Sequence, residues 1–217
     1  MRSLQRKSWP KNSDGSQKVF KAYKDFLPDL KENFGRYCCY CEKRERKLDV
    51  EHVAPKSHNP SQILDWDNLL LACPVCNRDY KKNKNPSRAG YVWPDVDDTF
   101  DIFEYHGDGS MTVNQSLSPQ KQVEAQNTIG LMNLNAPGGK NDEIRMIRME
   151  QWNVASDLLD EYKRKKISID SIVENVVANG YWSVWMTVFK DYPEVTQKIA
   201  DAFPGTLPKY CTPPSNS

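Results

Sequence analysis

Four cysteines form two Cys-x-x-Cys pairs, a spacing typical of metal-binding knuckles. The pairs are Cys38 with Cys41 and Cys73 with Cys76. Four thiolates complete the tetrahedral coordination of Zn²⁺ and leave no position open, so we expect a structural zinc site. Zinc binding would then contribute to folding, on the order of 10 kcal/mol in small zinc-dependent domains. Cys39 and Cys211 fall outside the pattern, and four buried thiols without metal are the alternative interpretation.

The segment between the two pairs carries side chains that suit phosphodiester hydrolysis. This reaction needs a base that deprotonates water, a cation on the developing charge, and groups that hold both in place. His52 could be the base, because a neutral imidazole accepts a proton near pH 7. Asn68 could orient that imidazole by accepting a hydrogen bond from its other ring N–H. A lone histidine after a glutamate is more often structural, so the spacing to the other residues carries the argument.

Oxygen ligands for a catalytic cation lie close to the same histidine in the sequence. Glu51 precedes it, Asn77 follows the second cysteine pair, and Asp49 is a reserve ligand. Carboxylate and amide oxygens are the ligands that Mg²⁺ or Mn²⁺ prefers. We therefore expect a catalytic Mg²⁺ or Mn²⁺ site that is separate from the structural zinc.

A short ββα unit is expected to position these groups. Residues 47–53 and 69–73 are predicted to be strands, and residues 74–83 a short helix with proline in its first turn. Neighbouring residues of an ideal strand face opposite ways, so Glu51 and His52 can share a cleft only if the strand ends or bulges there.

The rest of the chain is predicted to be mostly helical, which gives an α+β fold class. Helical spacing covers residues 16–33, 119–132, 139–164, 167–178 and 181–202, and a hairpin is expected within 100–114. We divide the chain into an N-terminal helical arm (1–35), a zinc-stapled ββα nuclease module (36–94), a hairpin connector (95–118), a helical region (119–205) and a loose tail (206–217).

Composition and charge set weaker limits on function. The chain has 217 residues and a formal net charge of +1, which neither requires nor excludes a nucleic-acid partner. No apolar run is long enough to span a bilayer and no secretory signal is evident, so we expect a cytoplasmic protein. Basic runs flank the candidate site, although an ordinary solvated surface would look the same. The residues expected to contact nucleic-acid phosphates are Lys56, Arg78, Lys81 and Lys82.

The order of these motifs resembles that of the HNH (ββα-metal) endonuclease family. The matching residues are Cys38-x-x-Cys41, Val50-Glu51-His52-Val53-x-Pro55-Lys56, and Trp66-x-Asn68-Leu-Leu-Leu-x-Cys73-x-x-Cys76-Asn77. The resemblance implies that His52 is the general base and that Asn68 steadies it. It also implies that Glu51 and Asn77 bind the catalytic metal, and that the products carry 5′-phosphate and 3′-hydroxyl ends. Asn77 stands where the family usually has histidine, which favours Mg²⁺ over Zn²⁺ at that site.

A narrower resemblance extends beyond this module. The opening Met-Arg-Ser-Leu, the form Glu-His-Val-x-Pro-Lys-Ser57 and the later Ala125-x-x-Thr128-Ile-x-Leu131-x-x-Leu134-Asn135 with Arg145 are similar to HNH subunits of Septu-type anti-phage systems. Related subunits occur in retron-associated defence operons. The resemblance implies an ABC/SMC-like ATPase partner, and also a retron reverse transcriptase with its nucleic acid in the second case.

The helical half, residues 115–205, would then be the surface that docks on the ATPase. Aromatic residues often anchor protein interfaces. The candidates are Trp152, Tyr181, Trp182, Trp185 and Phe189. An ordinary helical core is the alternative interpretation of this stripe.

Two other functions remain open at this point. The first is a non-catalytic, zinc-stapled adaptor that binds nucleic acid or protein, which the asparagine at position 77 keeps open. The second is a redox protein built on Cys38 and Cys41, which is disfavoured because a thioredoxin-like motif expects a βαβ context. The leading prediction is an endonuclease that cuts nucleic acid, DNA rather than RNA, as the effector of an ATPase-controlled defence complex.

Overall fold

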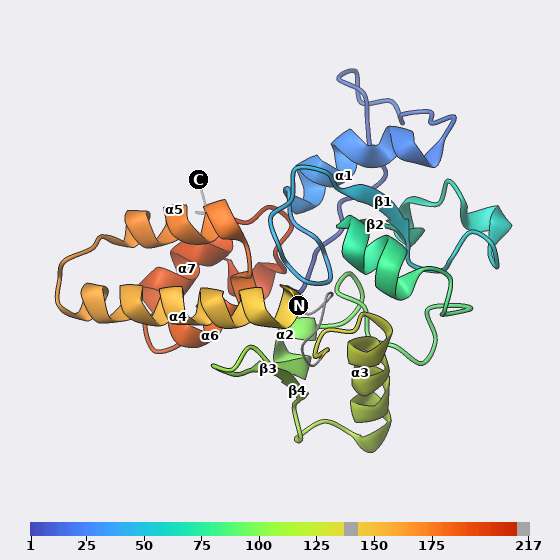
Figure 1. The fold of residues 1–217 in the computed structure, drawn as a ribbon. Helices are drawn as coiled ribbons and strands as arrows, with labels where there is room; N and C mark the ends of the chain where they lie inside the picture. The colour runs from blue at the N-terminus through green and yellow to red at the C-terminus, as the bar shows by residue number, and fades with distance from the viewer. Residues whose placement is uncertain (137–142, 212–217) are drawn as a thin grey trace.

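The computed structural model describes residues 1–136 and 143–211. Figure 1 shows a part built around α1 (Leu27–Phe34), β1 (Asp49–His52) and β2 (Leu69–Ala72), and a helical bundle beside it. The bundle contains α4 (Glu143–Lys163), α5 (Ile169–Asn179), α6 (Trp182–Val188) and α7 (Pro193–Asp201). Between them lie α2 (Thr99–Ile102), β3 (Phe103–Tyr105), β4 (Met111–Val113) and α3 (Pro119–Leu131). The expected α+β class and the ββα module followed by helices are confirmed.

The β1–β2 hairpin pairs antiparallel, with Asp49 opposite Ala72 and His52 opposite Leu69. Every residue of β2 is fully buried, as expected for a short apolar strand covered on both faces. A helix, Val75–Lys81, follows the second cysteine pair, so strand, loop, strand and helix occur in the expected order. β1 ends at His52, which is the condition under which Glu51 and His52 can reach one cleft.

The N-terminal helix is shorter than its spacing predicted. A 3₁₀ turn, Tyr23–Phe26, leads into α1, and Pro28 lies in the first turn, where its missing N–H costs no hydrogen bond. Gly35 ends α1 with a φ of 78°, as expected for a glycine at a helix end. The apolar residues before the turn do not continue the helix. Phe20 instead stacks on Phe26, with ring centroids 3.7 Å apart.

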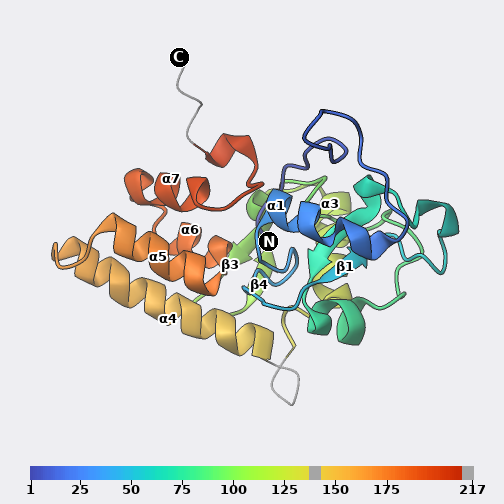
Figure 2. The same cartoon turned by 90° about the horizontal axis from the view of Figure 1, so that it is seen from above.

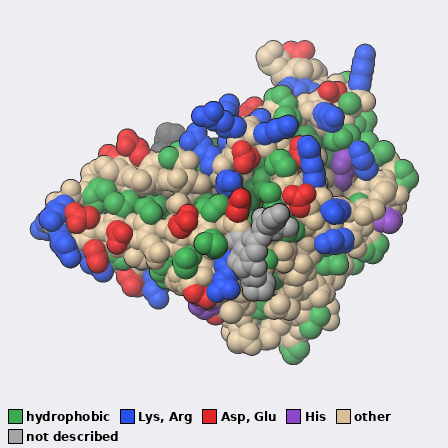
Figure 3. Space-filling model, in the orientation of Figure 1, with side chains coloured by type: hydrophobic (Ala, Val, Ile, Leu, Met, Phe, Trp, Pro, Cys, Tyr) green, Lys and Arg blue, Asp and Glu red, His purple; other side chains and the backbone are tan. Residues whose placement is uncertain are grey.

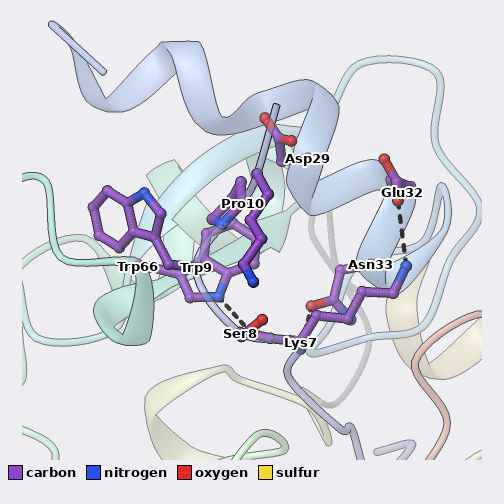
Figure 4. A pocket seen from close by; sticks show the side chains of 9 residues that line it. Lys7, Ser8, Trp9, Pro10, Asp29, Glu32, Asn33 and Trp66 are labelled. Carbon is purple, nitrogen blue, oxygen red and sulfur yellow. Dashed lines mark hydrogen bonds and ion pairs between the residues drawn. The ribbon is translucent and has the colours of Figure 1, made fainter. Parts of the chain in front are cut away.

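The extended N-terminal segment crosses α1 and closes over the module. Trp66 donates its indole N–H to the Lys7 carbonyl at 2.8 Å, and the Lys7 amide donates to Asn33 Oδ1 at 2.8 Å. Figure 4 shows the pocket that these residues line, with the Lys7–Glu32 ion pair at its edge. Its two carboxylates, Asp29 and Glu32, each form an ion pair with a lysine, Lys18 and Lys7 respectively.

The bundle packs in two layers that Figure 2 shows from above, with α4 against α6 and α5 against α7. The single helix predicted over residues 181–202 is wrong. α6 ends at Val188 and α7 starts at Pro193, because proline cannot donate the next helical hydrogen bond and disfavours a helical residue before it. The predicted hairpin is confirmed as β3–β4. In the part of the chain that the structure describes, no helix has the length and apolar character needed to cross a bilayer.

The aromatic stripe belongs to the core of the bundle. Tyr181, Trp182, Trp185 and Phe189 are each no more than 2% exposed. Only Trp152 of the expected docking residues is half-buried. The expectation that this stripe anchors a partner is therefore corrected, because side chains without exposed surface cannot contact a second protein.

The bundle joins the module through the turn that follows the first cysteine pair. Lys43 pairs with Gly180 as an isolated bridge, and Ser183 donates to the Glu42 carboxylate through its amide at 2.9 Å and its hydroxyl at 2.5 Å. Further contacts come from the chain end. Thr206 pairs with Leu4, and the Tyr210 hydroxyl donates to Asp98 at 2.7 Å. Of the segment expected to be a loose tail, residues 206–211 are packed, and residues 212–217 lie outside the described residues.

Candidate active site

The four knuckle cysteines meet in one buried cluster. Their sulfur atoms all lie within 4.8 Å of one another, and Cys41 Sγ is 3.8 Å from Cys73 Sγ. A tetrahedral zinc with Zn–S bonds of about 2.3 Å implies S–S separations of about 3.8 Å, so the cluster fits Zn²⁺. Cys39 lies outside the cluster, and burial raises the pKa of its thiol to about 12, which keeps it protonated. The predicted zinc ligands are thus brought together.

The candidate catalytic residues line one pocket at the end of β1. Glu51, His52 and Asn77 share its wall, although they come from the strand and from the helix that follows β2. Lys56 and Lys82 lie at the same pocket. The cysteine cluster lies beside this pocket, since Cys73 directly follows β2 and Cys76 belongs to the first turn of that helix.

The His52 imidazole is held at one edge. Its Nε2 lies 3.0 Å from the Ile63 carbonyl oxygen, which accepts a hydrogen bond when that nitrogen carries the proton. Burial lowers the pKa of His52, and the hydrogen bond to Ile63 opposes this in part. The neutral tautomer protonated on Nε2 leaves Nδ1 unprotonated, and this is the form that a general base requires.

The sequence analysis predicted a hydrogen bond between Asn68 and the His52 imidazole, but the Asn68 side chain bonds to the backbone instead. Its Oδ1 accepts from the Ala54 amide at 2.7 Å and its Nδ2 donates to the Ala54 carbonyl at 2.9 Å. The side chain is 2% exposed, so these two bonds satisfy an amide with little access to water. Asn68 therefore clamps the backbone two residues after His52, and the carbonyl that orients the ring belongs to Ile63.

Glu51 forms a buried ion pair that the sequence did not suggest. Its Oε1 lies 2.6 Å from Lys81 Nζ, and the same ammonium donates to the His52 carbonyl at 2.8 Å. Burial raises the pKa of Glu51 to about 7, with Lys81 opposing that shift. Lys81 was expected to contact phosphate, but its side chain is 0% exposed. The prediction that Lys81 contacts phosphate is therefore wrong, because this side chain is buried as the ion-pair partner of Glu51.

Asp49 and Arg78 pair with each other at the rim. Arg78 donates to the two carboxylate oxygens at 2.8 and 2.6 Å, and Asn77 Nδ2 lies 3.3 Å from Asp49 Oδ2. Both oxygens of the reserve ligand are thus engaged, which leaves Glu51 and Asn77 as the candidate metal ligands. A carboxylate and an amide oxygen at one pocket fit Mg²⁺ or Mn²⁺. The Arg78 side chain remains 58% exposed and accessible to a phosphate.

Tyr23 is a residue of this site that the sequence analysis missed. Its ring meets the His52 ring edge-on with centroids 4.9 Å apart, and Lys56 Nζ lies 4.4 Å from the centre of the Tyr23 ring. A cation over an aromatic face is attracted to it. The N-terminal arm therefore supplies one wall of the pocket. No spacing rule links residue 23 to residue 52, so only the folded chain reveals this contact.

Residues 38–83 match the HNH endonuclease family. This matched segment spans the two cysteine pairs, the hairpin and the helix that carries Asn77. Over 110 residues the chain is 30% identical to the Septu protein PtuB of Bacillus thuringiensis, which covers 49% of this chain and 39% of that protein. It is 35% identical over 85 residues to the Septu protein PtuB of Bacillus mycoides, covering 31% and 29%. The matched segments span less than two fifths of these relatives.

Proposed function

We propose that the protein is a metal-dependent endonuclease that hydrolyses phosphodiester bonds in nucleic acid, with DNA as the preferred substrate. The observation that carries the proposal is the shared pocket of Glu51, His52 and Asn77 inside a domain of the HNH endonuclease family. A pocket that combines a neutral imidazole, oxygen ligands and cationic side chains suits the attack of water on phosphorus.

Each residue has a distinct part in the proposed reaction. Nδ1 of His52 accepts a proton from water while the Ile63 carbonyl holds the opposite edge of the ring. Lys56 and Lys82 position the phosphate without reading the base sequence. Glu51 and Asn77 would hold Mg²⁺ or Mn²⁺, and that ion would stabilise the negative charge that develops on the phosphate oxygens.

A plasmid-nicking assay with Mg²⁺ or Mn²⁺ tests the activity, with an EDTA control. Replacing His52→Ala should lower the rate by roughly 10²–10⁴-fold while zinc content and fold remain unchanged. The matched control is His58→Ala, which removes an imidazole from the loop after the motif. Equal rates for wild type and His52→Ala would contradict the assignment of the base.

We propose further that this nuclease is the effector of a cytoplasmic anti-phage defence complex. The similarity to two Septu PtuB proteins supports this role. The expected controller is an ABC/SMC-like ATPase, with a retron reverse transcriptase as a further partner. The nicking assay should therefore be run with and without an ATPase of that class. Cleavage that is independent of such an ATPase would remove the controlled-effector role but not the nuclease.

A non-catalytic adaptor is the second candidate, and the Lys81–Glu51 pair is the observation that favours it. An ammonium 2.6 Å from the candidate ligand competes with a divalent cation for the same carboxylate. Mn²⁺ binding to the zinc-loaded protein, followed by electron paramagnetic resonance, separates the two candidates. A nuclease should bind Mn²⁺ and lose that binding in Glu51→Gln, whereas an adaptor should show no difference between the two proteins.

A further inference from the structure

A second cluster of cationic side chains lies outside the candidate active site, where the HNH domain meets the bundle. Its pocket, which we name the junction pocket, is lined by Arg36, Lys43, Arg44, Glu45, Arg46 and Ala178. Four cations thus surround one carboxylate. Glu45 lies 3.8 Å from Lys43, too far for a close ion pair, so most of the positive charge is not neutralised from within.

The arginines of this pocket are exposed and lightly engaged. Arg36, Arg44 and Arg46 are all exposed, and the Arg44 guanidinium reaches the Ala178 carbonyl at 3.5 Å, the outer limit for a hydrogen bond. Among the described residues no ion pair is found for any of these three side chains. Arginine presents a planar fork of donors that matches a phosphate group, so the chemistry of the pocket suits a phosphate-bearing ligand.

The junction pocket is connected to the active site by further cations. Lys47 follows Arg46 in the sequence and lines a middle pocket with Lys24, Arg78 and Asn77. Tyr23 and Asn77 also line the pocket of His52, so the middle pocket and the catalytic pocket adjoin. Figure 3 shows Lys and Arg side chains gathered over α1 and the β1–β2 hairpin and toward the bundle.

We propose that the junction pocket binds the phosphate backbone of the substrate strand some nucleotides away from the bond that is cut. This inference rests on the proposed nuclease function and extends it. Arg46 and His52 are six positions apart in the sequence, a span of at most about 20 Å along an extended chain. One DNA strand advances about 3.4 Å per phosphate, so the two pockets are about six nucleotides apart or less. Because six nucleotides is an upper bound, the substrate that cannot occupy both pockets is a dinucleotide, which has a single phosphate between its two sugars.

The test compares oligonucleotides of two lengths on protein that cannot cut them. All proteins carry His52→Ala and are loaded with zinc. The junction variant adds Arg36→Gln, Arg44→Gln and Arg46→Gln. The control variant adds Lys163→Gln, Arg164→Gln and Lys166→Gln. These are three exposed cations at the end of α4 and in the turn after it, and their loss removes the same charge far from the site (Figure 1). Kd is measured by fluorescence anisotropy from 50 to 300 mM salt on a DNA dinucleotide and on DNA of 20 base pairs.

On the 20-base-pair DNA, the junction variant should bind at least about tenfold more weakly near 100 mM salt. The plot of log K against log salt has a negative slope, and its magnitude should decrease by about 2–3 because three phosphate contacts are lost. On the dinucleotide the junction variant and its parent should bind alike. The control variant should match the parent on both. An unchanged slope on the long DNA, or equal losses on both lengths, would overturn the junction site. Cleavage of DNA by the His52-containing protein would still stand in that case, whereas no binding and no cleavage at all would remove the nuclease itself.

Discussion

The ammonium of Lys81 lies 2.6 Å from a carboxylate oxygen of Glu51, and the two side chains are 0% and 3% exposed. Removing one partner of a buried ion pair leaves the other charge uncompensated, which typically costs about 3–5 kcal/mol. We expect Lys81→Met to lower the free energy of unfolding by about 3 kcal/mol, measured by urea denaturation of the zinc-loaded protein. The double variant with Glu51→Gln should recover part of that loss, because neither charge remains. A Lys81→Met protein as stable as wild type would show that the pair is not buried in solution.

Asn68 should act on the backbone after His52 and not on the imidazole itself. Asn68→Ala removes both bonds to Ala54 and leaves a buried amide and carbonyl unpaired, which should cost about 1–3 kcal/mol. Hydrogen exchange of the Ala54 amide should speed up in this variant. The ¹⁵N chemical shifts of His52, which report the tautomer, should stay those of a ring protonated on Nε2. A changed His52 tautomer together with an unchanged exchange rate of the Ala54 amide would instead indicate a direct contact between Asn68 and the ring.

The cysteine cluster should account for one zinc ion and for the stability of the hairpin. Cys76→Ser replaces a ligand in the cluster, whereas Cys39→Ala alters an equally buried thiol outside it. We expect Cys76→Ser to lose zinc by mass spectrometry and to unfold on purification, since metal binding contributes on the order of 10 kcal/mol. Cys39→Ala should keep a stoichiometry of one. If the Cys39 variant lost zinc and the Cys76 variant kept it, the assignment of the zinc ligands would be wrong.

Acid should weaken the ion pairs that the buried Asp95 carboxylate forms with Arg6 at 2.7 Å and with Arg88 at 3.0 Å. Although burial raises the pKa of this carboxyl, Arg88 and Arg6 hold it below its ordinary value. A carboxyl whose folded pKa is lowered stabilises the protein above its unfolded pKa of about 4, and this contribution is lost as pH falls through the folded pKa. Wild type should therefore be more stable than Asp95→Asn at pH 7, with the gap closing below pH 4 in thermal denaturation. Acid also releases zinc from both proteins, so the difference between them is the quantity to follow.

Local sequence patterns predicted the parts of the site that short spacings determine. Each Cys-x-x-Cys pair, the apolar strand and the helix that follows Pro74 are encoded by a few consecutive residues. These elements carry Glu51, His52 and Asn77, which line one pocket in the folded chain. The resemblance to the HNH family rested on the same local order, and the family match over residues 38–83 confirms it.

Contacts between distant segments could not be predicted in this way. Tyr23 reaches His52 across 29 positions of sequence, and no periodicity relates the two. Lys81 looked like a surface cation because lysine is rarely fully buried unless it is paired, and its partner was visible only after folding. The sequence left two interpretations of the aromatic stripe, a helical core or a docking surface. Helical spacing alone does not reveal which face of a helix another helix covers.

The meeting of Gly180 with the turn after the first cysteine pair has a practical consequence. Gly180 has a φ of 88°, and a Cβ placed on it would stand 2.2 Å from the Glu42 carbonyl oxygen. The added methyl group of Gly180→Ala would therefore overlap with the Glu42 carbonyl and push the bundle away from the turn. One added methyl group would loosen the two halves from each other while the cysteines and His52 keep their own side chains, which would reveal whether the bundle governs the pocket from a distance.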